Sequence, residues 1–290
     1  MKKVAIIGLG LMGGSLGLAL RSGRLPVRVS GYARRERTRS LALDRGVADE
    51  VHDSPERAVE GADMVVFCTP VLAIPGLVRV CKPFLAPGCV VTDVGSTKAR
   101  LASELSGILR GCGRAFVGSH PIAGSEQTGI EAAKRDLYRG AVVFVTPGPR
   151  APRRAVARTV AFWKTVGARP VVSDPLGHDR LIARTSHLPH LVAAMLVDSA
   201  CRGRSAELKP FCGPGFRDTT RVAEGSPEMW HDIICTNRRA ILGELRRFRG
   251  VVDRLASLVE AGDFKAVERF LDGARRRRQE ALSPARRMGT

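Results

Sequence analysis

Short apolar runs alternate with helical patterns along the first 173 residues of the chain. The apolar runs are bounded by Asp, Pro or Gly, as buried strands are, and apolar residues recur at helical spacing between several of them. We expect strands at residues 3–8, 27–31, 64–69, 90–94, 116–117, 141–146 and 170–173, and helices at residues 12–22 and 36–46. This alternation predicts an α/β Rossmann-type domain with a doubly wound, mainly parallel sheet.

The pattern changes at Asp174, where the strand signals stop. Asp174 is a good helix N-cap, and Pro175 suits the first helical position. The rest of the chain has a helical pattern, except for a glycine-rich break at residues 212–215. We therefore expect one domain over residues 1–173 and an all-helical second domain over residues 174–290.

A glycine motif, Gly8-x-Gly10-x-x-Gly13, follows the first expected strand and opens the first expected helix. That context is the one a dinucleotide-binding fingerprint requires. The first glycine allows a tight turn, the second lets the pyrophosphate approach the backbone, and the third lets helix and strand pack closely. We expect the cofactor to contact Gly8, Gly10, Leu11, Met12 and Gly13, together with Thr69 and Pro70 at the end of the strand at residues 64–69.

The end of the second expected strand indicates which dinucleotide is bound. Sites for NAD place a carboxylate there to accept hydrogen bonds from the ribose. In this chain, residues 30–35 contain no acid, and Arg34 and Arg35 stand there instead. A guanidinium group can hold a 2′-phosphate that a carboxylate would repel. We therefore expect NADP rather than NAD, with Arg34 and Arg35 binding the phosphate.

Composition narrows the class of protein. The chain has 290 residues, of which 44% are hydrophobic and 26% are charged, as in a globular protein. No apolar run approaches the roughly 20 residues that span a bilayer, and the N-terminus lacks the pattern of a signal peptide. The seven cysteines are odd in number and include no CxxC pair, which favours reduced thiols over a disulfide framework or a zinc site. We expect a cytoplasmic protein without a membrane partner.

The net charge of +19 first suggests a nucleic-acid partner. However, the 39 arginines and 8 lysines are spread along the whole chain, aromatic content is 5%, and no aromatic residues interleave with the basic ones. Solvated surfaces and anionic small ligands account for this charge better than nucleic acid does. A protein that binds nucleic acid, and uses the dinucleotide only as a signal, is the alternative from a different class.

Further polar motifs follow two expected strands and occupy the helical half. Residues 93–98 and 117–129 begin at carboxyl ends of strands, the edge where parallel sheets bind ligands. His120 precedes Pro121, so its backbone is extended, and it is a candidate acid or base. His187 and His190 share a helix face, where they could line the site or pack against the first domain. No third ligand accompanies them, so we expect no metal.

The helical half also contains a pair of arginines. Arg217 and Arg221 are four residues apart and would share one face if that segment is helical. Solvation of a polar helix face would explain such a pair. Two guanidinium groups beside a cleft would also suit a ligand with several carboxylates.

Five stretches together resemble the prephenate/arogenate (cyclohexadienyl) dehydrogenase family of tyrosine biosynthesis: residues 8–17, 93–98, 120–126, 186–190 and 216–233. The resemblance covers roughly residues 1–270. It implies oxidative decarboxylation of prephenate to 4-hydroxyphenylpyruvate, with hydride transfer to NAD(P)+, or alternatively of arogenate to tyrosine. It also implies that the helical domain binds substrate and forms an intertwined homodimer.

The resemblance carries residue roles as well. It implies that His120 accepts the proton of the ring hydroxyl, and that Ser96 contacts the same hydroxyl and orients this histidine. It implies that Arg221 binds a substrate carboxylate and that His190 and His187 line the site. The remaining expected substrate-binding residues are Arg217, Ser125 and Glu126, the last of them near the mouth of the site. Ala33 replaces the acid typical of members that use NAD, which again favours NADP.

A related class, the two-domain β-hydroxyacid dehydrogenases, depends on a catalytic lysine in the helical domain. This chain has only Lys209 and Lys265 there, and neither lies in a convincing motif. The sequence therefore argues against a β-hydroxyacid dehydrogenase.

Overall fold

The computed structural model describes residues 1–23, 26–124 and 127–283. The chain folds into two compact units, Met1–Ile241 and Leu242–Thr290. The sheet and the helices up to residue 241 thus form one compact unit. The domain boundary after residue 173 stays a prediction.

An eight-stranded sheet forms the base of the first unit, in the order β3-β2-β1-β4-β5-β6-β7-β8. All neighbouring strands are parallel except β6 and β7, which confirms the mainly parallel sheet. The strands are β1 (Lys3–Ile7), β2 (Arg28–Tyr32), β3 (Glu50–His52), β4 (Met64–Phe67), β5 (Val90–Asp93), β6 (Ala115–Pro121), β7 (Val142–Pro147) and β8 (Arg169–Val172). The sequence analysis missed β3, which has three residues at the sheet edge and is too short for a period-2 pattern.

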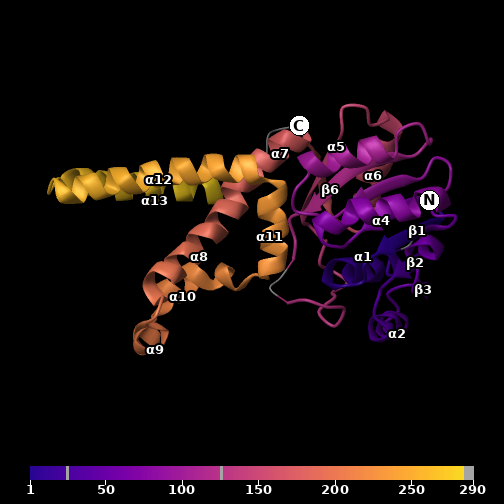
Figure 1. Cartoon of the computed structure of the whole chain (residues 1–290), viewed down its shortest axis with the longest axis horizontal. Helices are drawn as coiled ribbons and strands as arrows, with labels where there is room; N and C mark the ends of the chain where they lie inside the picture. The colour runs from indigo at the N-terminus through magenta and orange to yellow at the C-terminus, as the bar shows by residue number, and fades with distance from the viewer. Residues whose placement is uncertain (24–25, 125–126, 284–290) are drawn as a thin grey trace. The chain divides into compact units, whose positions relative to one another are not determined.

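Helices cover both faces of this sheet (Figure 1). One face packs against α1 (Leu11–Arg21), α2 (Glu36–Asp44) and α6 (Arg153–Thr165), and the other against α3 (Pro55–Val59), α4 (Ile74–Cys81) and α5 (Ala99–Ile108). The side chains of β1 alternate accordingly: Val4 and Ile6 belong to the first core, Ala5 and Ile7 to the second. This is the doubly wound arrangement that the sequence predicts.

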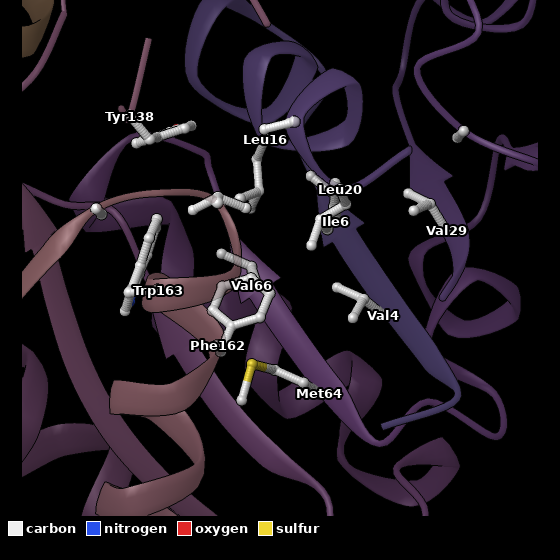
Figure 2. Packing of buried hydrophobic residues seen from close by; sticks show 14 of the residues in the cluster. Val4, Ile6, Leu16, Leu20, Val29, Met64, Val66, Tyr138, Phe162 and Trp163 are labelled. Carbon is white, nitrogen blue, oxygen red and sulfur yellow. The ribbon is translucent and has the colours of Figure 1, made fainter. Parts of the chain in front are cut away.

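Two large aromatic residues close the first core, where Figure 2 shows Tyr138 and Trp163 near Leu16 and Val66. Both are fully buried. The Trp163 indole donates to the Ser119 hydroxyl at 2.9 Å, and the Tyr138 hydroxyl donates to the Met12 carbonyl oxygen at 2.8 Å. Because buried polar atoms need partners, these bonds fix α6 to β6 and the segment around residue 138 to the start of α1.

The remaining helices of the first unit begin at Asp174, whose side chain accepts from the Gly177 amide as an N-cap. They are α7 (Pro175–Ile182), α8 (Leu188–Cys201), α9 (Ser205–Leu208), α10 (Pro214–Thr220) and α11 (Pro227–Thr236). A π-helical turn, Ala183–His187, joins α7 to α8. Pro189, near the start of α8, cannot donate to the preceding turn, which explains the widened turn at this point.

The second unit is a helical hairpin. It contains most of α12 (Arg238–Glu260) and α13 (Phe264–Leu282), which lie side by side in Figure 1. Asp263 caps α13 by accepting from the Ala266 amide at 2.9 Å, and the Arg254 guanidinium lies over the Phe270 ring. Among the described residues, none of the helices combines the length and apolar character that crossing a bilayer requires.

Candidate active site

The three fingerprint glycines have the geometry of a dinucleotide cradle. Gly8 has φ +105°, a conformation that favours glycine. A Cβ atom on Gly13 would lie 1.9 Å from the Gly8 carbonyl oxygen, so only glycine lets α1 approach β1 this closely. A Cβ on Gly10 would meet no protein atom within 4 Å among the described residues. The chain therefore leaves room beside Gly10 and the start of α1, where a pyrophosphate is expected.

A cavity of roughly 540 Å³ opens beside this cradle. Six of the expected cofactor residues line it: Gly8, Gly10, Arg34, Arg35, Thr69 and Pro70. Leu11 and Met12 lie instead in the first turn of α1. The sequence analysis missed other lining residues, among them Tyr32, Arg37, Thr38, Ile130 and Glu131. Tyr32, Arg37 and Thr38 flank Arg34 and Arg35 in the same segment. Residues 130–131, in contrast, reach the cavity only through the tertiary fold.

The loop after β2 presents its cations to this cavity. Arg39 donates to the carbonyl oxygens of Ala33 and Arg34, at 3.2 and 2.9 Å, which holds the loop backbone. Arg37 pairs with Glu131 at 3.4 Å. The side chains of Arg34 and Arg35 are exposed, and within the described part of the chain neither forms an ion pair. Two guanidinium groups are therefore available to an anionic ligand.

His120 lies near the carboxyl end of β6 and is partly buried. Its Nδ1 is 2.9 Å from Nε2 of His178, and Nδ1 of His178 is 2.8 Å from Oδ1 of Asp179. Both partners come from α7 and were missed by the sequence analysis. Their position directly after the predicted helix start is visible in the sequence, but nothing in their spacing indicates contact with a residue 58 positions away.

The environment of His120 keeps its imidazole neutral. Burial lowers the pKa of His120 well below its usual value, and the nearby His178, Lys98 and His187 lower it further. The unprotonated ring can therefore accept a proton at neutral pH.

Ser96 lies in the loop between β5 and α5 and is half-buried. A buried ion pair between Asp93 and Lys98 brackets this loop. Asp93 also accepts from the Ser119 amide at 3.1 Å, and the Lys98 ammonium donates to the Ser119 carbonyl oxygen at 2.9 Å. The loop is thus clamped to the residue that precedes His120. Within the described residues no hydrogen bond joins Ser96 to His120, whose Nδ1 is instead bonded to His178.

Helix α11 packs against the loop between β5 and α5. The Thr97 and Thr236 hydroxyl oxygens are 2.7 Å apart, and the Leu72 amide, two residues after Pro70, donates to Asp232 at 3.3 Å. One helix therefore contacts both the loop that holds Ser96 and the segment beside the cofactor cavity. Trp230 lies on this helix.

His187 and His190 come together around Trp230. The His190 ring stacks on the indole, with centroids 3.5 Å apart and planes 10° apart, and His187 meets the same indole edge-on at 5.8 Å. The amide nitrogen of Asn237 donates to the Asp179 carbonyl oxygen at 2.8 Å and lies 3.3 Å from Nδ1 of His187. Asn237 thus links His187 to the backbone of Asp179, while His190 is held by its stack on Trp230.

Nε2 of His187 is buried and has no hydrogen-bond partner among the described residues. Burial lowers the pKa of His187 to about 4, so its ring is neutral at pH 7. Because Nδ1 accepts from Asn237, the proton of this neutral ring is on Nε2. This buried donor is therefore free to donate a hydrogen bond to a bound ligand or water.

Two expected substrate residues lie on the surface of this chain. Arg217 belongs to α10, and Arg221 begins a 3-10 turn, Arg221–Glu224, that packs against α8. Both side chains are exposed. Ser125 and Glu126 lie outside the described residues. No group of three or more His, Cys, Asp or Glu side chains in the described ranges could hold a metal ion.

Comparison with known proteins gives the same family for both halves of the chain. The nucleotide-binding domain of prephenate dehydrogenase matches residues 16–172, and its dimerization domain matches residues 174–273. A prephenate dehydrogenase from Bacillus subtilis (strain 168) is 33% identical over 289 residues, which cover 96% of this chain and 78% of the relative.

Two solved structures are similar over nearly the whole chain. Prephenate dehydrogenase from A. aeolicus, in complex with hydroxyphenyl propionate and NAD+, has a TM-score of 0.90 and 31% identity, covering 97% of this chain and 98% of that one. Synechocystis arogenate dehydrogenase has a TM-score of 0.82 and 29% identity, covering 97% and 100%. The chain therefore belongs to the prephenate dehydrogenase family and is a dehydrogenase that uses a nicotinamide cofactor.

Proposed function

We propose that the protein catalyses oxidative decarboxylation of prephenate to 4-hydroxyphenylpyruvate, and that it uses NADP+ in preference to NAD+. The observation that carries the proposal is the neutral imidazole of His120, near the carboxyl end of β6 in the same sheet as the glycine cradle. The bound nicotinamide would supply the hydride acceptor.

His120 acts as the general base through Nε2, because its Nδ1 is bonded to His178. Removal of the ring hydroxyl proton strengthens electron donation from the oxygen, so hydride leaves the carbon that bears it. The carbonyl that forms then draws in the electrons of the bond to the carboxylate, and CO₂ leaves as the ring becomes aromatic. The phenolate recovers the proton from His120. Such a base typically contributes about 10²–10⁴-fold to the rate.

The other site residues bind and orient the substrate in this proposal. The Ser96 hydroxyl contacts the same substrate hydroxyl as His120. Prephenate is a dianion, so the exposed guanidinium of Arg221 binds one carboxylate, with Arg217 adding positive charge nearby. His187 offers its unpartnered Nε2 proton, and His190 lines the site from its stack on Trp230. Ser125 and Glu126 are proposed to bind substrate as well, and the sequence resemblance implies that Glu126 is near the mouth of the site.

The preference for NADP+ rests on the cations after β2. Arg34 and Arg35 line the cavity beside the cradle and have no ion-pair partner in the described ranges, so they are free to bind a 2′-phosphate. Because the match to the family's dimerization domain covers residues 174–273, we also propose that the active form is a homodimer built through these helices.

A two-by-two rate comparison tests the proposal, with prephenate or arogenate as substrate and NADP+ or NAD+ as acceptor. We expect the highest kcat/KM for prephenate with NADP+, and 4-hydroxyphenylpyruvate as product. His120→Asn should lower kcat by at least about 100-fold and leave cofactor affinity near that of the wild type. Absence of turnover with both substrates would overturn the proposed activity, and faster turnover of arogenate would reassign the substrate.

A further inference from the structure

His178 and Asp179 are adjacent residues of α7, and both are almost fully buried. Their relative exposures are 0% and 3%. Burial of an imidazole and a carboxylate is costly unless their polar atoms are hydrogen-bonded. Here both ring nitrogens of His178 and both carboxylate oxygens of Asp179 have partners.

The partners of Asp179 determine where the proton of His178 lies. Oδ1 accepts from the Lys98 amide at 2.8 Å, and Oδ2 accepts from the Ala99 amide at 2.9 Å. Two backbone amides at the start of α5 therefore hold the carboxylate as an acceptor. Nδ1 of His178, 2.8 Å from Oδ1, must donate to it. In the neutral ring, Nε2 of His178 is then left without a proton and can only accept.

The same reasoning extends to His120. Nε2 of His178 is 2.9 Å from Nδ1 of His120, so this contact is a hydrogen bond only if His120 carries its proton on Nδ1. Nε2 of His120 then keeps its lone pair. The Phe144 ring meets the His178 ring edge-on at 5.1 Å, and Phe144 is the residue of β7 paired with His120 in the sheet. Packing therefore holds the His178 ring in the plane that this bond needs.

We propose that His178, held by Asp179, is a positioning residue that locks His120 in the tautomer with an unprotonated Nε2. The kinetic consequence of this role rests on the proposed function, because that lone pair is the one that would accept the substrate proton. When Nε2 of His120 takes up the proton, its Nδ1–H bond to His178 strengthens, and the Asp179 carboxylate stabilises the charge shared by the two rings. A merely structural histidine would fix α7 to the sheet without selecting a tautomer.

Two variants separate these roles because they replace different ring nitrogens. His178→Gln places an amide oxygen near the position of Nε2, where it can accept from His120. His178→Asn places an amide group near Nδ1, where it can donate to Asp179 but cannot reach His120. Both variants retain a polar group in the buried site, so a comparison of their thermal unfolding midpoints controls for loss of fold.

The test is long-range ¹H–¹⁵N NMR of the histidine rings in the full chain at neutral pH, with the His120 signals assigned from their loss in His120→Asn. We expect His120 to carry its proton on Nδ1 in the wild type and in His178→Gln, and on Nε2 in His178→Asn. A proton on Nε2 in the wild type, or no change of tautomer in a folded His178→Asn protein, would overturn the proposal.

Kinetics add a second readout. We expect His178→Asn to lower kcat of the dehydrogenase reaction by about 100-fold with little change in KM, and His178→Gln to recover part of that loss. Equal losses in both folded variants would contradict the positioning role. The NMR measurement needs no substrate, so it can confirm the tautomer of His120 even in a protein that fails to oxidise prephenate. The positioning role and the proposed function can therefore fail separately.

Discussion

The imidazole of His190 lies flat on the indole of Trp230, with ring centroids 3.5 Å apart, and Gly225 makes this stack possible. A Cβ atom on Gly225 would lie 2.6 Å from Nε1 of Trp230 and 3.1 Å from Cε1 of His190. The glycine therefore borders a pair of rings that we place in the substrate site.

We expect Gly225→Ala to displace the stack, lower the free energy of unfolding by about 1–3 kcal/mol and raise the KM for substrate. Gly215→Ala is the matched control, because a Cβ there would meet no atom within 4 Å in the described structure. Urea unfolding and steady-state kinetics measure both effects. Identical behaviour of the two variants would show that Gly225 does not hold the stack.

The cradle glycines give a second test, because Gly13 and Gly10 face different surroundings. A Cβ on Gly13 would overlap the Gly8 carbonyl oxygen, whereas a Cβ on Gly10 would project into open space. We expect Gly13→Ala to cost at least about 1–3 kcal/mol of stability and to lose cofactor binding as well. Gly10→Ala should fold normally and lose cofactor affinity alone. Thermal unfolding and fluorescence titration with NADPH distinguish them, and normal affinity in Gly10→Ala would place the pyrophosphate elsewhere.

Cofactor preference can be tested at the loop after β2. We expect Arg34→Gln and Arg35→Gln each to weaken NADP+ binding by about tenfold or more, because each removes a charge-assisted hydrogen bond of about 1.5–3 kcal/mol to the 2′-phosphate. Binding of NAD+, which lacks that phosphate, should hardly change. Arg37→Gln is the control, since Arg37 is already paired with Glu131. Equal losses for the two cofactors would remove these arginines from phosphate recognition.

Acid should destabilise the protein through His187. Its pKa in the folded protein is about 4, below the value of 6.5 expected when the chain unfolds. Between these two pH values the unfolded chain binds more protons at this residue than the folded protein does. The free energy of unfolding therefore falls as pH decreases through 6.5, and this loss levels off below about pH 4. The expected contribution between pH 7 and pH 5 is about 2 kcal/mol.

His187→Asn removes this titration while keeping an oxygen near Nδ1 that can accept from Asn237. Urea unfolding at pH 7 and pH 5 should show a smaller loss of stability in the variant than in the wild type. The same pH dependence in both proteins would mean that His187 titrates normally in the folded state.

Local sequence was enough to predict the elements of the sheet and part of the site. Apolar runs and their boundaries located seven of the eight strands. Central strands such as β1 and β4 are buried on both faces and therefore need a continuous apolar stretch. Gly8, Gly10 and Gly13 can be predicted from the sequence as a cofactor cradle, since their proposed roles depend on a single strand-to-helix turn. Asp174 and Pro175 indicated a helix start in the same way.

Only the tertiary structure placed the groups that come from distant segments. The antiparallel direction of β7 depends on a connection whose path has no local pattern. Glu131 reaches the cavity beside the glycine cradle from far along the chain. His178 meets His120 across 58 positions, and Asp179 in turn binds His178. Spacing along the sequence determines which residues share a strand or a helix face. Which side chain lies behind the imidazole of His120 depends on how the helices pack onto the sheet, and that packing is decided by the whole core rather than by any one segment.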